Sequence, residues 1–176
     1  GGAKAEWYQQ ADAFAKLVEG KTIDDVKALV AEDGKGTDEV VNAGCTIAIA
    51  DFVSVIETAV KNATDSNAKA DSTIKLGVVT SQSGKDATEE ANGEVELATT
   101  VVAVALDADK KVVVASTDVA TAKFIFDIKG VSSTDTTVPI TTKKTAGANY
   151  GMALYGSDLN GDGIVKEWYE QADAFN

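Results

Sequence analysis

The stretch Val95–Ser116 reads VELATTVVAVALDADKKVVVAS and predicts the centre of a β-sheet. Its first part, Val95–Leu106, is rich in Val, Ala and Thr and long enough for a full strand. Residues 107–110, Asp-Ala-Asp-Lys, then predict a turn, and Val112–Ser116 returns as the hairpin partner. A hairpin of this kind belongs to an antiparallel sheet.

Working outward from the hairpin, further strands are predicted at 74–80, 123–128 and 138–142. Helices are predicted on the N-terminal side, at 5–19, after Thr22 (with Asp25 as its capping-box partner) and from Asp51 onward. The last helix should turn Phe52, Val55, Ile56, Ala59 and Val60 inward. Residues 31–44 are predicted as loop and 46–50 as a short strand or an extended turn. The fold class is therefore α+β, an antiparallel sheet with amphipathic helices packed on it.

The order of these elements predicts a single domain over 1–176 with four parts. They are a helical half (1–63), a polar linker (64–72), a β-rich half (73–155) and a C-terminal segment (156–176).

Charge and composition exclude several function classes. The chain has 28 acidic and 16 basic residues, a net charge of −12, and no His, and all of its basic residues are Lys. The negative charge would repel nucleic acids and anionic lipids. Because the chain has no His, catalysis by His and metal binding through His are excluded. No stretch is apolar enough to span a membrane, so no membrane insertion is expected. The single Cys45 is predicted to be a small core residue.

One nine-residue motif occurs twice. Glu6–Phe14 reads EWYQQADAF and Glu167–Phe175 reads EWYEQADAF, so eight of nine positions agree. Two interpretations stay open: the second copy only marks one register of a tandem repeat, or both copies are used, one inside the domain and one against a neighbouring subunit. The second interpretation predicts a circularly permuted or swapped repeat unit with an interface at Trp7, Phe14, Trp168, Tyr169 and Phe175.

The segment before the second copy resembles the first half of a calcium-binding loop. Asp158, Asn160 and Asp162 provide oxygen at loop positions 1, 3 and 5, and Ile164 offers a carbonyl. The closing position 12 holds Tyr169, and Glu170 follows one residue later. These residues, with Glu170 as the closing ligand, are the candidate calcium site, and a flexible linker is the alternative.

A second constellation is Ala43-Gly44-Cys45-Thr46, followed by Val55–Ala63, which reads VIETAVKNA. In permuted order, this arrangement resembles the secreted FMN-binding domain family of electron-transfer complexes. The resemblance implies that Thr46 is the position that would carry FMN through a phosphoester bond. The chain is also similar to tandem-repeat secreted proteins of anaerobic Gram-positive bacteria, which carry segments like GKEWYEQ and YGM.

Together these features predict a non-catalytic extracellular or cell-surface structural domain that associates head-to-tail with copies of itself, with calcium as a candidate aid. The alternative is an extracytoplasmic electron-transfer domain that carries FMN.

Overall fold

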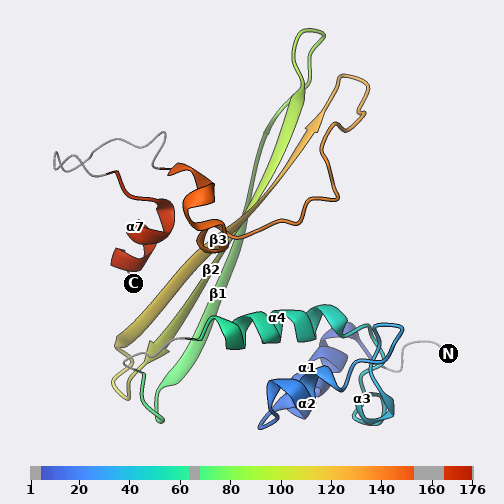
Figure 1. Cartoon of the computed structure of the whole chain (residues 1–176), viewed down its shortest axis with the longest axis vertical. Coiled ribbons are helices and arrows are strands. Elements are labelled where there is room, and N and C mark those ends of the chain that lie inside the picture. The colour runs from blue at the N-terminus through green and yellow to red at the C-terminus, as the bar shows by residue number, and fades with distance from the viewer. Residues whose placement is uncertain (1–4, 64–67, 153–164, 176) are drawn as a thin grey trace. The chain divides into compact units, whose positions relative to one another are not determined.

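The computed structural model describes residues 5–63, 68–152 and 165–175 of the chain. The chain forms two compact units, Gly1–Asp65 and Ser66–Asn176 (Figure 1). Their boundary falls inside the segment 64–72 that the sequence predicts as a linker. Helices and one antiparallel sheet are both present, so the predicted α+β class is confirmed.

The first unit is helical, with helices α1 (Trp7–Val18), α2 (Ile23–Lys27), α3 (Asp38–Asn42) and α4 (Ala50–Lys61). Each contributes an apolar side chain to one buried cluster, which also includes one residue that follows α2 and two residues between α3 and α4. The cluster consists of Phe14, Val26, Leu29, Val40, Cys45, Ile49 and Val53. Cys45 is a buried free thiol, as predicted.

Two expectations for this unit are wrong. The predicted loop 31–44 contains α3. Val55, Ala59 and Val60 of α4 are exposed and Val53 is buried instead, because α4 turns the side of the helix that follows Ile49 toward the core. The apolar pattern of α4 fits two adjacent faces of the helix, and packing against the other helices decides which face is buried. Of the two alternatives for 46–50, the strand is reduced to an isolated bridge between Lys35 and Ala48.

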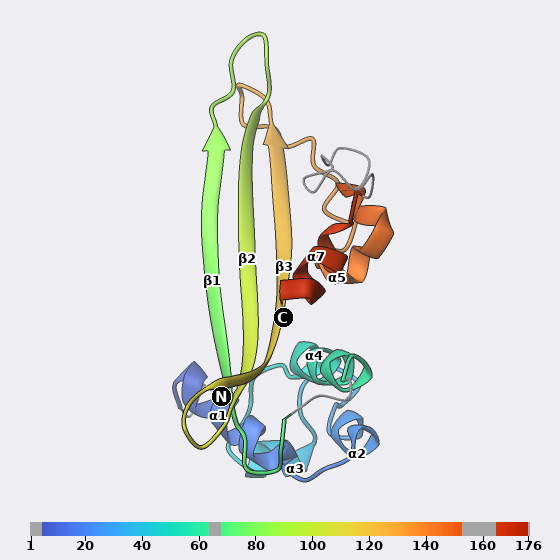
Figure 2. The same cartoon turned by 90° about the vertical axis from the view of Figure 1, so that its left-hand side faces the viewer.

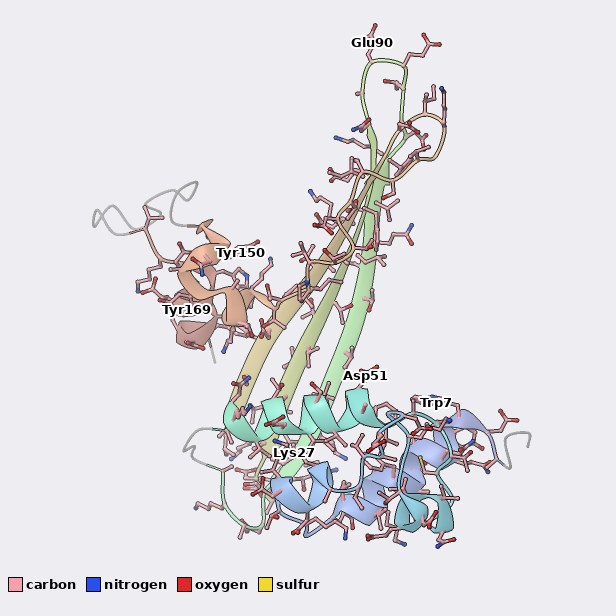
Figure 3. All side chains as sticks on the ribbon, turned by 45° about the vertical axis from the view of Figure 1, so that its right-hand side comes forward. Trp7, Lys27, Asp51, Glu90, Tyr150 and Tyr169 are labelled. Carbon is pink, nitrogen blue, oxygen red and sulfur yellow. The ribbon has the colours of Figure 1, made fainter. Side chains whose placement is uncertain are left out.

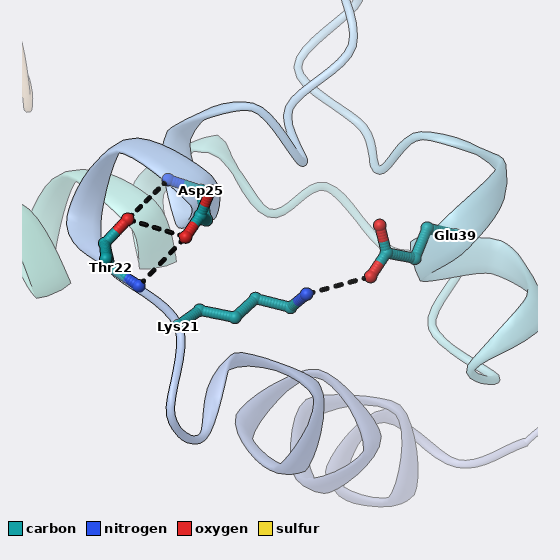
Figure 4. A network of polar contacts seen from close by, with 4 residues as sticks. All are labelled: Lys21, Thr22, Asp25 and Glu39. Carbon is teal, nitrogen blue, oxygen red and sulfur yellow. Dashed lines mark hydrogen bonds and ion pairs between the residues drawn. The ribbon is translucent and has the colours of Figure 1, made fainter.

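The start of α2 follows the sequence closely (Figure 4). The Thr22 Oγ1 accepts a hydrogen bond from the Asp25 N–H, and the Asp25 carboxylate accepts from the Thr22 N–H and hydroxyl, so the predicted capping box is present. The hydrogen bonds from Thr22 lower the pKa of Asp25 from its ordinary value of 3.8. Beside it, the Lys21 ammonium pairs with Glu39 at 3.0 Å and joins the α1–α2 turn to α3.

The second unit is built on a three-stranded antiparallel sheet in the order β1-β2-β3 (Figure 2). The strands are β1 (Thr73–Lys85), β2 (Gly93–Leu106) and β3 (Val112–Phe126). The two strands predicted at 112–116 and 123–128 are one continuous strand, since every residue of this range from Val112 to Phe126 except Val113 has a partner in β2. The predicted strand 138–142 is wrong, and only an isolated bridge joins Thr142 to Ala120.

Short helices lie beside β3 (Figures 1 and 2). They are α5 (Lys143–Ala146), the 3₁₀ helix η1 (Gly147–Tyr150) and α7 (Trp168–Phe175). Helices α5 and α7 contact β3, and both also contact η1. Strand β1 is exposed along its whole length. Among the described residues, no helix is long and apolar enough to cross a membrane.

Candidate interaction site

The first copy of the repeated motif forms α1 and is fixed by hydrogen bonds at its start. The Glu6 N–H donates to the Gln9 side chain at 3.0 Å in a capping box. The Gln10 amide nitrogen donates to the Ala5 carbonyl at 2.9 Å. The motif therefore determines its own helix start.

The second copy forms α7 with the same local bonds. The Glu167 N–H donates to the Glu170 carboxylate at 2.8 Å, and the Gln171 amide nitrogen donates to the Lys166 carbonyl at 2.9 Å. These bonds match those of Glu6 and Gln10 one for one. The only position that differs between the copies, Gln9 against Glu170, is the capping position, where both side chains offer an oxygen.

The two copies bury different residues of the same motif. In α1, Gln10 and Phe14 are each 2% exposed, whereas their counterparts in α7 are exposed, Phe175 by 81%. The core stripe of the motif, Gln10 and Phe14 in α1, is thus covered in one copy and uncovered in the other.

The reverse holds for the remaining apolar positions. Trp7 and Tyr8 of α1 are 62% and 60% exposed, and Trp7 lies at the surface of the helical unit (Figure 3). In α7, Trp168 and Tyr169 are half-buried, and Ala172 is buried. These positions, with the motif's Asp, form a docking stripe: Trp7, Tyr8, Ala11 and Asp12 in α1, and Trp168, Tyr169, Ala172 and Asp173 in α7.

Helix geometry places the two stripes side by side. At 3.6 residues per turn, the core stripe and the docking stripe are centred roughly 100° apart around the helix axis. Trp7 lies at the border between them, where its ring meets Phe52 of α4 edge-on at 6.0 Å. One helix can therefore present both stripes to different partners at the same time.

The docking stripe of α7 rests on a set of residues that we name the helix seat: Lys143, Lys144, Tyr150 and Met152. The Lys143 ammonium lies over the rings of Tyr150 and Trp168, at 5.0 and 5.4 Å from their centroids. The Lys144 ammonium pairs with Asp173. The Met152 N–H donates to the Glu167 carboxylate at 3.0 Å.

Backbone contacts fix the seat on the sheet. The Lys144 N–H donates to the Asp118 carboxylate of β3 at 3.1 Å, and the Thr142 hydroxyl accepts from the Thr145 N–H at the start of α5. The sequence does not point to Lys143 and Lys144, which belong to no motif, whereas Tyr150 and Met152 belong to the YGM segment. The Gln and Asp that recur in both copies of the motif were the sequence features that could have indicated polar contacts of α7.

Thr46, the candidate FMN position, lies next to α1. Its N–H and its hydroxyl both donate to the Gln10 amide oxygen at 2.8 Å. The residue itself is exposed and borders a shallow hollow with Glu32, Asp33 and Lys35. Thr46 thus ties the chain after α3 to the core stripe of α1.

Most of the candidate calcium site, Asp158, Asn160, Asp162 and Ile164, lies outside the described residues. Glu170 is described and exposed, and one of its carboxylate oxygens caps α7. Of the predicted interface residues, Trp168 lies at the helix seat, Tyr169 is half-buried on the same helix, and Phe14 lies in the helical core. Phe175 and Trp7 are largely exposed.

Strand β1 carries a second uncovered apolar surface. Ile74, Leu76 and Val78 alternate along the strand on one face and are 65%, 67% and 56% exposed. An exposed apolar row of this kind is typical of a surface that binds another protein.

No protein-family model matches the chain, and neither the curated proteins nor the solved structures compared with it give a match.

Proposed function

We propose that this chain is a non-catalytic structural domain that associates head-to-tail with copies of itself through the repeated helix motif. The observation that carries this proposal is the complementary burial of the two copies. The core stripe is buried in α1 and exposed in α7. Of the docking stripe, Trp168 and Tyr169 are half-buried and Ala172 is buried in α7, whereas their aromatic counterparts Trp7 and Tyr8 are exposed in α1. In the assembly, one motif helix would be covered on both stripes, the core stripe by one subunit and the docking stripe by another.

The uncovered side chains are the kind that interfaces use. Trp and Tyr are enriched where proteins bind each other, and here both are more than half exposed on α1. A motif helix with its docking stripe on one subunit and its core stripe on another makes a heterologous contact. Contacts of this type produce rings or filaments, which suits a structural role.

The composition supports a location outside the cell or on its surface. A net charge of −12 keeps separate copies apart at low ionic strength, so screening by salt or bridging by calcium would favour assembly. A calcium ion at Asp158, Asn160, Asp162 and Glu170 would join the segment before the second motif copy to the first turn of that copy.

Light scattering on the full chain tests the proposal. We expect the mean molar mass to rise with protein concentration, at about 0.15 M salt to screen the net charge. A mass that stays at the monomer value up to high concentration, with and without calcium, would exclude assembly.

A second candidate function follows from the exposure of Thr46. Thr46 is exposed, so a cofactor could be attached to its hydroxyl. In the structure this hydroxyl donates a hydrogen bond to the Gln10 amide oxygen. A domain of this kind would carry FMN and transfer electrons outside the cytoplasm. Protein from a host with a flavin-transferring enzyme would then have the mass of one attached FMN, and the Thr46→Ala variant would lose it. An unmodified mass removes this candidate.

A further inference from the structure

We propose that helix α1 of one copy docks through its docking stripe onto the helix seat of a second copy, and that α7 is the built-in competitor for that seat. This inference rests on the proposed self-association. It names α1 as the helix that docks (the donor), the helix seat as the surface that receives it (the acceptor), and α7 as the helix that regulates the contact.

The donor presents every side chain that the seat already binds. At the seat, Trp168 meets Lys143, Asp173 meets Lys144, and Glu167 meets the Met152 N–H. The matching residues of α1 are Trp7, Asp12 and Glu6, which are identical in type and exposed.

Charge complementarity favours the same pairing. The seat offers two ammonium groups, Lys143 and Lys144, in a chain whose net charge is −12. The docking stripe of α1 offers an exposed carboxylate, Asp12, and an exposed indole, Trp7, on neighbouring helical turns. The interactions that hold α7 would hold α1 equally well.

Helix α1 can dock without leaving its own unit. Its core stripe stays in the helical core, because the docking stripe lies beside the core stripe. Exchange in the opposite sense, with α7 entering the helical core of another copy, would first have to remove Phe14 and Gln10 of α1 from full burial. It would also lose Leu17 and Val18, which pack against that core.

Release of α7 is the less costly step. Among the residues of the second motif copy, Glu167 and Ala172 are the buried ones, Trp168 and Tyr169 are half-buried, and Phe175 is exposed. Exposing these groups gives up less apolar burial than exposing the Phe14 ring and its surroundings. We therefore assign α1 as the donor and α7 as the displaced helix.

The tether makes α7 a regulator. A helix joined to its seat by a short chain competes at an effective concentration of about millimolar. Assembly should stay weak while α7 is seated and should strengthen when α7 is loosened. Each copy then has one donor and one acceptor, which gives open chains or closed rings.

Two double variants of the full chain test this assignment. Asp12→Lys with Lys144→Glu keeps attraction between α1 and the seat and makes the seat repel Asp173 of α7. Asp173→Lys with Lys144→Glu keeps attraction between α7 and the seat and makes the seat repel Asp12 of α1. Both variants have the same composition and the same net charge, so general charge effects cancel.

We expect the first variant to assemble more tightly than the wild type and the second more weakly. Because each exposed pair contributes modestly, the apparent dissociation constants should differ by roughly tenfold between them. A second readout is fluorescence in a Trp168→Phe background, where Trp7 is the remaining Trp. Its emission should shift to the blue as concentration rises, because α1 docking covers the ring.

The outcomes separate this inference from the proposed function. If the wild type assembles but the two double variants behave alike, or in the opposite order, α1 is not the donor, although self-association stands. If the wild type and both variants stay monomeric at every concentration, self-association fails and this inference fails with it.

Discussion

The Gln10 amide oxygen accepts two hydrogen bonds from Thr46, one from its backbone N–H and one from its hydroxyl, both at 2.8 Å. Gln10 is 2% exposed, and its amide nitrogen is bound to the Ala5 carbonyl. A polar side chain therefore lies at the centre of the contact between α1 and the chain that follows α3. Its counterpart Gln171 has the same local bond but lies exposed.

This relationship predicts unequal effects at one motif position. Gln10→Ala should lower the free energy of unfolding of the helical unit by about 1–3 kcal/mol, because the Thr46 N–H loses its acceptor. Urea unfolding followed by circular dichroism measures the change. Gln171→Ala is the matched control and should change stability by no more than about 0.5 kcal/mol. Equal effects would contradict the assignment of the core stripe.

The last position of the motif gives a second matched pair. Phe14 is 2% exposed in the core and Phe175 is 81% exposed. Phe14→Ala should cost about 3–5 kcal/mol of unfolding free energy, through lost burial and the cavity left behind. Phe175→Ala should stay within about 0.5 kcal/mol. A large loss of stability from Phe175→Ala would show that α7 has a core that the structure does not describe.

The capping box of α2 predicts a response to acid. The Thr22 hydrogen bonds lower the pKa of Asp25 in the folded state, so its contribution to stability is present above the ordinary value of 3.8. That contribution is lost as the pH falls through the lowered folded-state pKa. Unfolding free energies measured from pH 5 downward should fall less steeply in Asp25→Asn than in the wild type. An unchanged slope would exclude Asp25 as a source of the acid response.

Calcium binding is predicted from the loop that begins at Asp158. Three side-chain ligands without a Glu at position 12 should give a site weaker than a sensor loop, with a dissociation constant above about 10⁻⁵ M. Isothermal titration calorimetry should show calcium heat that disappears in Asp158→Ala and Asp162→Ala. Heat that both variants retain would place any calcium elsewhere.

Local patterns in the sequence predicted the local structure well. The capping box at Thr22, the turn at Asp107 and the hairpin around it all form, because these features depend on residues a few positions apart. The expected break within β3 was wrong, because Thr117, Asp118 and Thr121 interrupt the apolar pattern between the two predicted strands. Pairing with β2 continues through them, since backbone bonds to a neighbouring strand do not depend on side-chain polarity.

The candidate site was predictable only in part. The repetition of EWYxQADAF indicated that one helix occurs twice, and the interface role of the motif's aromatic residues stays a prediction. Lys143 and Lys144 were not predictable, because their role depends on β3 and α5 bringing them to α7.

The sequence by itself determined that both copies of the motif form a helix with the same capping bonds, because those bonds join residues within the motif or next to it. Only the tertiary structure decided which stripe of each helix is covered. Nine nearly identical residues offer the same two stripes in both places. Burial depends on the neighbouring surfaces, a helical core beside α1 and a lysine-lined seat on the sheet beside α7.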